Sequence, residues 1–326
     1  MLRVVTRDFT WQDGERLVRF GTGALKDAPD LLGDGYVLLT TERGEASAPD
    51  VVERAAAVHH VPAGLVDEVA GDLLDAVDGQ LLVSLGGGRV IDVAKALAAA
   101  RRTATAAIPT TLSAAEMTGG HRHARGVDTS AITHVRPRIV VNDPSISASQ
   151  PDAELAASAA NALGHAVEGP MTPKASPVPA LAACEAVRLL AADDDREALA
   201  LGALLAGYVI DSAGYGLHHV LAQTLARFAG VWHGYANAAM LPHVVVALRR
   251  RAPAVLDALD DAAGEPVEAL ARRFAQRAGA QQLRDLGVTE EALETCVQKA
   301  LERPDRAATA PAADEAEIRA LYEAAW

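Results

Sequence analysis

The feature that most constrains the fold is a short apolar run that leads through three glycines into a long alanine-rich segment. Residues 81–100 read LLVSLGGGRVIDVAKALAAA. The apolar run predicts a buried strand, and the residues after the glycines predict a helix. Gly86, Gly87 and Gly88 therefore stand at a strand-to-helix turn, where bare backbone N–H groups and the helix dipole favour an anion such as a phosphate. A plain tight turn would also explain three glycines taken alone.

Strand and helix patterns alternate through the first part of the chain. Strand-like runs occupy residues 16–25, 35–41, 80–88, 105–111 and 136–144, and helical patterns occupy residues 49–58, 64–78 and 90–102. Strands that alternate with helices are typical of an α/β fold. We expect a parallel sheet with helices on both faces.

The pattern changes at about residue 150, after which strand-like runs vanish and long helical patterns follow one another. Residues 142–152 are polar and rich in turn formers, which indicates a domain boundary. We therefore predict an α/β dinucleotide-binding domain over residues 1–150 and an all-helical domain over residues 151–326. The cleft between two such domains is the usual place for a ligand.

Composition limits the partners of the chain. Its 326 residues carry a formal net charge of −13, which argues against nucleic acid and anionic membranes but is compatible with a small anionic substrate. Cys184 and Cys296 lie far apart and are expected to be buried thiols. The first residues lack the apolar core of a signal peptide, and we find no apolar run of membrane-spanning length. We expect a cytoplasmic protein.

Two motifs resemble those of a known family. GGGRVIDVAK, residues 86–95, and AIPTTLSAAEMT, residues 107–118, are similar to paired motifs of the iron-containing alcohol dehydrogenase superfamily. The resemblance implies a dehydroquinate synthase-like architecture with a Rossmann-like first domain. It also implies that the glycines hold the pyrophosphate of NADH or NADPH. The cofactor site that it implies consists of Gly86, Gly87, Gly88, Asp92, Lys95, Pro109, Thr110, Thr111 and Thr118.

Within this superfamily the chain is most similar to the maleylacetate reductase branch. Segments such as FGTGAL, NALGHAVE, GLHHVLAQTL and EIRALYEAAW follow in matching order. The resemblance implies a dimeric enzyme that reduces maleylacetate to 3-oxoadipate with NADH or NADPH during the degradation of aromatic compounds.

The end of the strand at residues 35–41 bears on the choice of cofactor. An acid there would bind the ribose 2′-hydroxyl and repel a 2′-phosphate. This chain has Thr40 and Thr41, followed by Glu42. Since two hydroxyls repel neither form, we expect Thr41 to contact the cofactor and both NADH and NADPH to be used.

Histidines and one asparagine form a second constellation. Asn161 and His165 are four residues apart on a predicted helix, His218 and His219 are adjacent, and His233 follows fourteen residues after His219. In metal-dependent relatives, the resemblance implies, the four positions of Asn161, His165, His219 and His233 carry Asp and three His that bind Fe²⁺ or Zn²⁺. An amide is a poorer ligand than a carboxylate, so we expect weak metal binding or none.

Three roles for this constellation stay open. Asn161, His165, His218, His219 and His233 could bind and protonate an anionic keto-dicarboxylate without a metal, with His219 or His233 supplying the proton. They could instead form a weak three-histidine metal site, or they could be structural.

The chain also departs from the family motifs near the expected cofactor. Leu112 stands where the family has an aromatic residue, and Ala114 and Ala115 replace a Gly-Ser pair. Two other functions are therefore weighed, a metal-dependent alcohol or aldehyde dehydrogenase and a non-catalytic dinucleotide-binding protein.

The remaining histidines carry weaker signals. His121 and His123 lie in a cationic loop with Arg122 and Arg125, which could meet substrate carboxylates or simply be exposed. His59, His60, His134 and His243 are expected to be structural.

Overall fold

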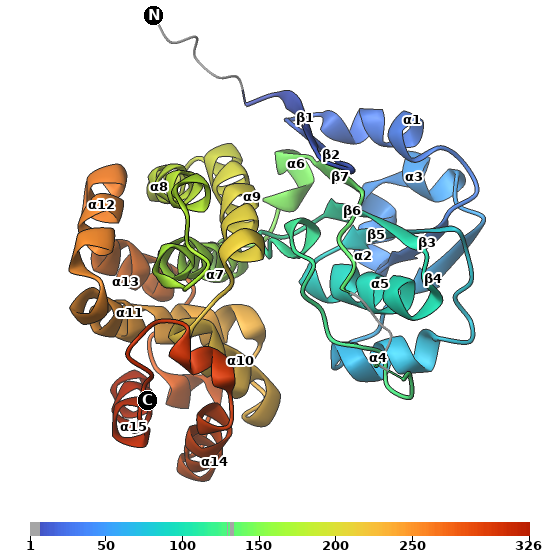
Figure 1. Ribbon diagram of the computed structural model, residues 1–326. Helices are drawn as coiled ribbons and strands as arrows, with labels where there is room; N and C mark the ends of the chain where they lie inside the picture. The colour runs from blue at the N-terminus through green and yellow to red at the C-terminus, as the bar shows by residue number, and fades with distance from the viewer. Residues whose placement is uncertain (1–6, 129, 131–133) are drawn as a thin grey trace, which may run out of the picture. The chain divides into compact units, whose positions relative to one another are not determined.

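A computed structural model describes residues 7–128, 130 and 134–326 (Figure 1). Residues 1–6, which belong to the segment tested for a signal peptide, lie outside the described residues. The chain divides into two compact units, Met1–Gln150 and Pro151–Trp326.

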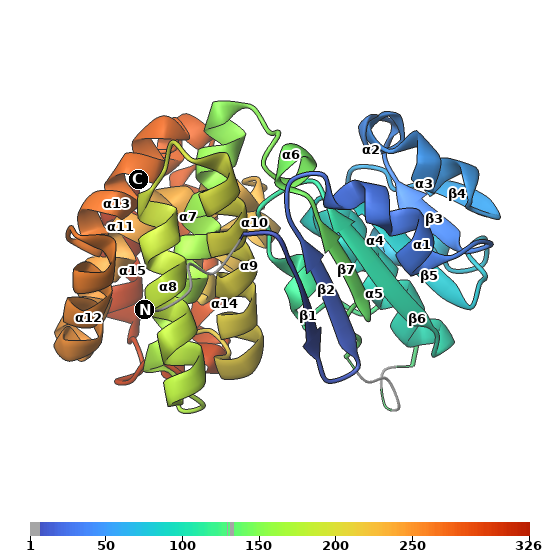
Figure 2. The same cartoon turned by 90° about the horizontal axis from the view of Figure 1, so that it is seen from above.

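The first unit is built on a seven-stranded sheet with the strand order β1-β2-β7-β6-β5-β3-β4 (Figure 2). The strands are β1 (Phe9–Asp13), β2 (Arg16–Phe20), β3 (Val37–Thr40), β4 (Ala57–His60), β5 (Leu81–Gly86), β6 (Ala104–Pro109) and β7 (Ile139–Asn142). All neighbouring strands are parallel except β1 and β2. The triglycine run begins at the last residue of β5, and the Pro-Thr-Thr run begins at the last residue of its parallel neighbour β6, so both lie at the same edge of the sheet.

The α/β class is confirmed, but the sheet is mixed and not wholly parallel. Strand β1 pairs antiparallel with β2, in a hairpin that the periodicity of the sequence did not reveal. Its turn contains Gly14, which has a positive φ of 60° and follows Asp13. Asp13 pairs with Arg16, so Gly14 and Glu15 form a two-residue turn, and a glycine at its first position is a hairpin signal because it adopts a positive φ without strain.

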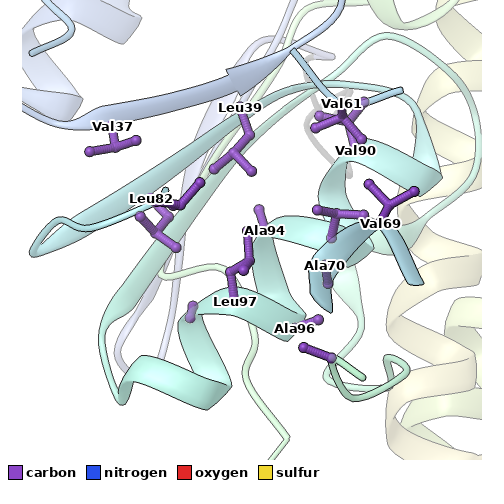
Figure 3. Packing of buried hydrophobic residues seen from close by; sticks show 14 residues of the cluster. Val37, Leu39, Val61, Val69, Ala70, Leu82, Val90, Ala94, Ala96 and Leu97 are labelled. Atoms are coloured by element: carbon purple, nitrogen blue, oxygen red, sulfur yellow. The ribbon is translucent and has the colours of Figure 1, made fainter. Parts of the chain in front are cut away.

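Helices cover both faces of the sheet, as predicted. Helices α4 (Val66–Leu73) and α5 (Gly88–Arg101) pack on one face, and η1 (Ala24–Asp27), α1 (Ala28–Leu32) and α3 (Pro49–Glu53) pack on the other. Alternate side chains of β3 point to opposite faces: Val37 and Leu39 join the first core and Leu38 the second. Figure 3 shows Ala94 and Leu97 of α5 on the side of the helix that faces Leu82 of the sheet.

The second unit is all-helical, and the described chain from residue 151 to 326 contains no strand. Its α-helices are α7 (Asp152–Glu168), α8 (Pro177–Ala191), α9 (Arg196–Ala213), α10 (Leu217–Phe228), α11 (His233–Arg251), α12 (Pro253–Ala263), α13 (Val267–Arg277), α14 (Glu290–Leu301) and α15 (Glu315–Ala325). Thr289 caps α14 by accepting a hydrogen bond from the backbone N–H of Ala292.

One long helical pattern proves to be two helices. The continuous apolar periodicity over residues 194–230 breaks at residues 214–216, where α9 ends and α10 begins at an angle of 103°. The break positions the adjacent histidines, because it makes them the second and third residues of α10. Among the described residues no single helix has the length and apolarity to cross a membrane, and only the bent α9–α10 pair meets those criteria jointly.

Candidate active site

The triglycine turn begins α5 in the way an anion site requires. Gly87 is the N-cap residue, in an extended conformation, and no side chain caps the helix. The first turn of α5 contains no acidic residue. The N–H groups at the N-terminus of this 14-residue helix carry its partial positive charge. They are therefore available to bind a negatively charged group.

The glycines are also required by close packing against the loop after β6. A Cβ on Gly87 would lie 2.9 Å from Cγ2 of Thr111, and a Cβ on Gly88 would lie 2.9 Å from Cβ of Ser113. Neither distance leaves room for a methyl group without movement of the loop. The structure thus brings together two runs, residues 86–88 and 109–113, that are about 20 residues apart in the sequence and that sequence reasoning assigned to one site.

Lys95 links α5 to the loop after β6. Its side chain is fully buried, and its Nζ lies 2.7 Å from Oδ1 of Asp92, 3.1 Å from the carbonyl oxygen of Ala115 and 3.2 Å from Oγ1 of Thr118. The contacts with Ala115 and Thr118 are hydrogen bonds, and the contact with Asp92 is an ion pair. Lys95 therefore ties the loop after β6 to α5.

The departures from the family motif have a structural counterpart. Ala114 has a φ of 62°, in the left-handed region that favours glycine and costs other residues about 1 kcal/mol. Leu112 is buried. The loop thus keeps a glycine-like backbone with a side chain in place of glycine, and Ala115 packs against Ile91 of α5.

The threonines after β3 are occupied by their own backbone. Oγ1 of Thr40 donates to the carbonyl oxygen of Leu85 at 2.8 Å, and Oγ1 of Thr41 accepts from the N–H of Gly44 at 3.2 Å. Thr41 thereby caps the short helix α2 (Glu42–Ser47), whose first residue is exposed. These bonds position the end of β3, and the expected contact of Thr41 with a cofactor stays a prediction.

The second unit gathers the predicted histidines at one place. Asn161 and His165 lie on α7, His218 and His219 on α10, and His233 at the start of α11. The rings of His165 and His219 are stacked with centroids 4.5 Å apart, and the ring of His218 meets His219 edge-on at 4.9 Å. Apart from His233, which is exposed, these side chains are at most 7% exposed. Residues 50 positions apart in the sequence thus form one buried imidazole cluster.

Sequence reasoning missed a carboxyl group at the centre of this cluster. Glu168 on α7 is fully buried, and its Oε2 lies 2.7 Å from Nδ1 of His219. It also accepts the backbone N–H groups of His218, at 2.6 Å, and of His219, at 3.2 Å. Since these groups all donate to Glu168, His219 carries its proton on Nδ1 and directs the lone pair of Nε2 away. The signal was present, because Glu168 stands three residues after His165 on one helix face.

The ring nitrogens of the cluster that lack a hydrogen-bond partner are able to accept a proton. Nδ1 of His165 and Nε2 of His219 are buried and have no hydrogen-bond partner among the described residues. Burial lowers the pKa of His219 to about 3, aided by nearby His233, and it also lowers the pKa of His165. The same burial raises the pKa of Glu168, which the N–H donors around it oppose. Both imidazoles are therefore neutral at pH 7 and able to accept a proton.

The same residues do not fit a metal ion. Among the described residues, no three or more His, Cys, Asp and Glu side chains are grouped so that they could hold one. His233 is turned toward its own helix, with its Nε2 3.1 Å from Nδ2 of Asn237. With an amide at position 161 as well, the donor set lacks both the charge and the arrangement that Fe²⁺ or Zn²⁺ prefers.

The predicted cationic loop forms a separate ring cluster in the first unit. The centroid of His121 lies 5.4 Å from that of His123 and 5.3 Å from that of His134. Both ring nitrogens of His121 are used, one by the carbonyl oxygen of Arg122 and the other by the N–H of Val135. His121 thus closes this loop on itself. At the far edge of the sheet, His60 forms an exposed pair with Glu45.

Comparison with known proteins places both units in one family. Residues 155–326 match the family model described as "Fe-containing alcohol dehydrogenase family, C-terminal", and residues 43–151 match the model "Iron-containing alcohol dehydrogenase". The match to the first model alone covers more than half of the chain.

Individual relatives include both reductases and alcohol dehydrogenases. A maleylacetate reductase of Pseudomonas aeruginosa is 30% identical over 305 residues, covering 85% of this chain and 86% of the relative. A 1,3-propanediol dehydrogenase of Klebsiella pneumoniae is 30% identical over 214 residues, 58% of this chain and 55% of the relative. The crystal structure of maleylacetate reductase from Agrobacterium tumefaciens has a TM-score of 0.81, with 27% identity over 99% of both chains.

Proposed function

The chain belongs to the Fe-containing alcohol dehydrogenase family, and from this premise we propose that it is an NAD(P)H-dependent reductase of a small keto-dicarboxylate, similar to maleylacetate reductase. Membership of the family makes it an oxidoreductase. The observation that carries the proposed chemistry is the Glu168–His219 pair, in which a buried carboxyl group orients an imidazole whose Nε2 is free.

The cofactor half of the proposal rests on the triglycine turn. Its N–H groups and the dipole of α5 would bind the pyrophosphate, and Thr111, packed on Gly87, would line the same site. When bound, NAD(P)H supplies a hydride. The residues of the triglycine turn would bind and orient it, and Lys95 holds the loop after β6 against that turn.

The imidazole cluster would supply the proton for the reduction. Reduction of a carbon–carbon or carbon–oxygen double bond consumes a hydride and one proton. Nε2 of His219 can take up that proton when an anionic substrate arrives and can then release it to the substrate. Glu168 at Nδ1 stabilises the imidazolium in the meantime, and the stacked His165 excludes water from one face of the ring.

The substrate class is inferred from charge and relatives together. Once protonated, the unpartnered nitrogens of His165 and His219 would donate hydrogen bonds to the oxygens of an anionic substrate. Several relatives are maleylacetate reductases, among them those of Pseudomonas aeruginosa and Sphingobium indicum, at 29–30% identity. The second candidate, an alcohol dehydrogenase that uses a metal, is favoured by the similarity to 1,3-propanediol dehydrogenase.

The test is turnover by chelator-treated enzyme. We expect NADH or NADPH to be oxidised on addition of maleylacetate, and His219→Gln to lose at least about a hundredfold in kcat. His243→Gln, on α11 outside the cluster, is the matched control and is expected to stay within about twofold of the starting enzyme. If activity appears only with added Fe²⁺ or Zn²⁺ and an alcohol or aldehyde, the second candidate is correct.

A further inference from the structure

Resting on the proposed dinucleotide site, we propose that Glu116 takes up a proton when a dinucleotide binds at the triglycine turn, so that cofactor affinity falls as the pH rises. Glu116 would thus act as a positioning residue that couples cofactor binding to pH. It touches neither the substrate nor the reacting atoms.

Glu116 is an unusual carboxyl group because it is buried without full compensation. It lies in η2 (Ala115–Met117), is 1% exposed, and its Oε2 has no hydrogen-bond partner among the described residues. A buried ionised carboxylate normally has several donors. This carboxyl group is therefore near the balance between its charged and neutral forms.

The charged groups around Glu116 also bind other partners. Lys95 donates hydrogen bonds to Ala115 and Thr118 and forms an ion pair with Asp92. Arg16 of β2 donates to Asp13 at 2.6 Å and to the carbonyl oxygen of Met117 at 2.6 Å, while its Nε is buried without a hydrogen-bond partner among the described residues. Both cations stabilise a charged Glu116 through space, but burial outweighs them and raises the pKa of Glu116 to about 7.

The position of Glu116 links it to the anion site. A Cβ on Gly88 would lie 2.9 Å from Ser113 and 3.9 Å from Ala115, the neighbour of Glu116 in the chain. Lys95, whose charge acts on Glu116, lies seven residues along α5 from Gly88, which is about 10 Å of helix. A negative charge added about 10 Å from a buried carboxyl group would raise the pKa of that group by about one unit.

The other titratable groups nearby do not provide the same effect. Asp92 and Lys95 form an ion pair, and Asp13 is paired with Arg16. His121, which interacts with Asp92 and Lys95, has a pKa lowered by burial to about 4 and stays neutral above pH 6. Proton uptake near pH 7.5 that Glu116→Gln abolishes therefore reports on Glu116.

The experiment is calorimetric titration with NADH and with ADP-ribose, in two buffers of different ionisation enthalpy at pH 7.5. A pKa that rises from about 7 to about 8 takes up about half a proton per site, and Kd should rise about fivefold to sixfold between pH 6.5 and 8.5. Glu116→Gln should abolish both effects. Glu45→Gln, an exposed residue paired with His60 beyond β3, is the matched control and should keep them.

ADP-ribose separates the two ends of the cofactor, because it keeps the pyrophosphate and lacks the nicotinamide. Equal uptake with both ligands supports the proposal, whereas uptake with NADH alone, or unchanged uptake in Glu116→Gln, overturns it. If neither ligand nor NADPH binds, the dinucleotide site itself is wrong and the proposal falls with it. If NADH binds without proton uptake, only the role of Glu116 is wrong.

A second measurement uses only the wild-type protein, so it does not depend on whether the Glu116→Gln variant folds. Infrared difference spectra of the wild-type protein should gain the carbonyl stretch of a buried protonated carboxyl group on adding ADP-ribose at pH 7.5. Absence of that band, with ADP-ribose bound, also overturns the proposal.

Discussion

At the scale of single residues, two buried glutamates carry the predictions about charge and protonation. Neither of them was singled out from the sequence. Glu168 accepts N–H groups and orients His219, while Glu116 is buried with an unpartnered oxygen. One carboxyl group is well satisfied and the other is not. This difference gives the two residues different predicted behaviour.

Replacing Glu168 by Gln should impair catalysis and stability together. The amide must turn an N–H₂ group toward a donor, which leaves a buried bond unmade and costs about 1–3 kcal/mol. It also removes the preference for the Nδ1–H form of His219, so kcat should fall about tenfold to a hundredfold while Kd for NADH stays unchanged. Steady-state kinetics, NADH titration and chemical unfolding measure these effects. Glu185→Gln, at an exposed ion pair on α8, should change none of them.

Replacing Glu116 by Gln should change how stability depends on pH. The pKa of Glu116 is raised in the folded state to about 7 from an ordinary value of 4.5. Between these values the folded state binds more protons than the unfolded state, so the wild type loses stability as the pH rises from 4.5 to 7. The variant, whose amide does not titrate, should be more stable than the wild type at pH 8, by about 2–3 kcal/mol, and should not be more stable at pH 4.5. Urea unfolding of both proteins at both pH values measures this difference in stability. If the variant were more stable than the wild type by the same amount at pH 4.5, this prediction would be wrong.

At the scale of elements, the N-terminus of α5 and the loop after β6 behave as one unit. Gly87 and Gly88 permit the contact, and Lys95 fastens it. The helix alone would offer an anion site, but the loop fixes which backbone groups a ligand can reach.

The contact makes a specific prediction about Gly88→Ala. The new methyl group would meet Ser113, at 2.9 Å from its Cβ and 3.1 Å from its Oγ, so the loop must move away from α5. We expect Kd for NADH to rise at least about tenfold with the fold retained, as measured by fluorescence titration and circular dichroism. The double variant Gly88→Ala with Ser113→Gly removes the clash and should recover most of the affinity. Failure to recover it would mean that the methyl group blocks the ligand directly.

At the scale of the whole molecule, the chain consists of two units with different chemistry. The triglycine turn and the loop after β6 belong to residues 1–150, and the imidazole cluster belongs to residues 151–326. A ligand of the first unit should therefore stabilise that unit by mass action.

NADH should raise the unfolding temperature of the first unit. At one hundred times its Kd, a ligand adds about 2.7 kcal/mol, or about 5–10 °C for a unit of this size. Trp11 reports on the first unit when Trp232 and Trp326, both in the second, are replaced by Phe. We expect its fluorescence transition to move upward with NADH. A transition that stays in place would count against a dinucleotide site at the triglycine turn.

The sequence by itself determined the class of fold, the change to helices near residue 150, the strand-to-helix turn at Gly86–Gly88 and the histidine positions. These follow from local periodicity, turn chemistry and motif spacing, which are short-range properties of the chain. Even the β1 hairpin had a local signal at Asp13 and Gly14.

Only the tertiary structure decided how those residues are used. It broke the helical pattern at residues 214–216, so that His219 reaches Glu168 from another helix, and it turned His233 toward Asn237. It also buried Glu116 near two cations, Arg16 and Lys95, and left its Oε2 without a hydrogen-bond partner among the described residues. Burial and hydrogen-bond partners set the charge and the tautomer of a side chain, and both depend on contacts between residues far apart in the chain.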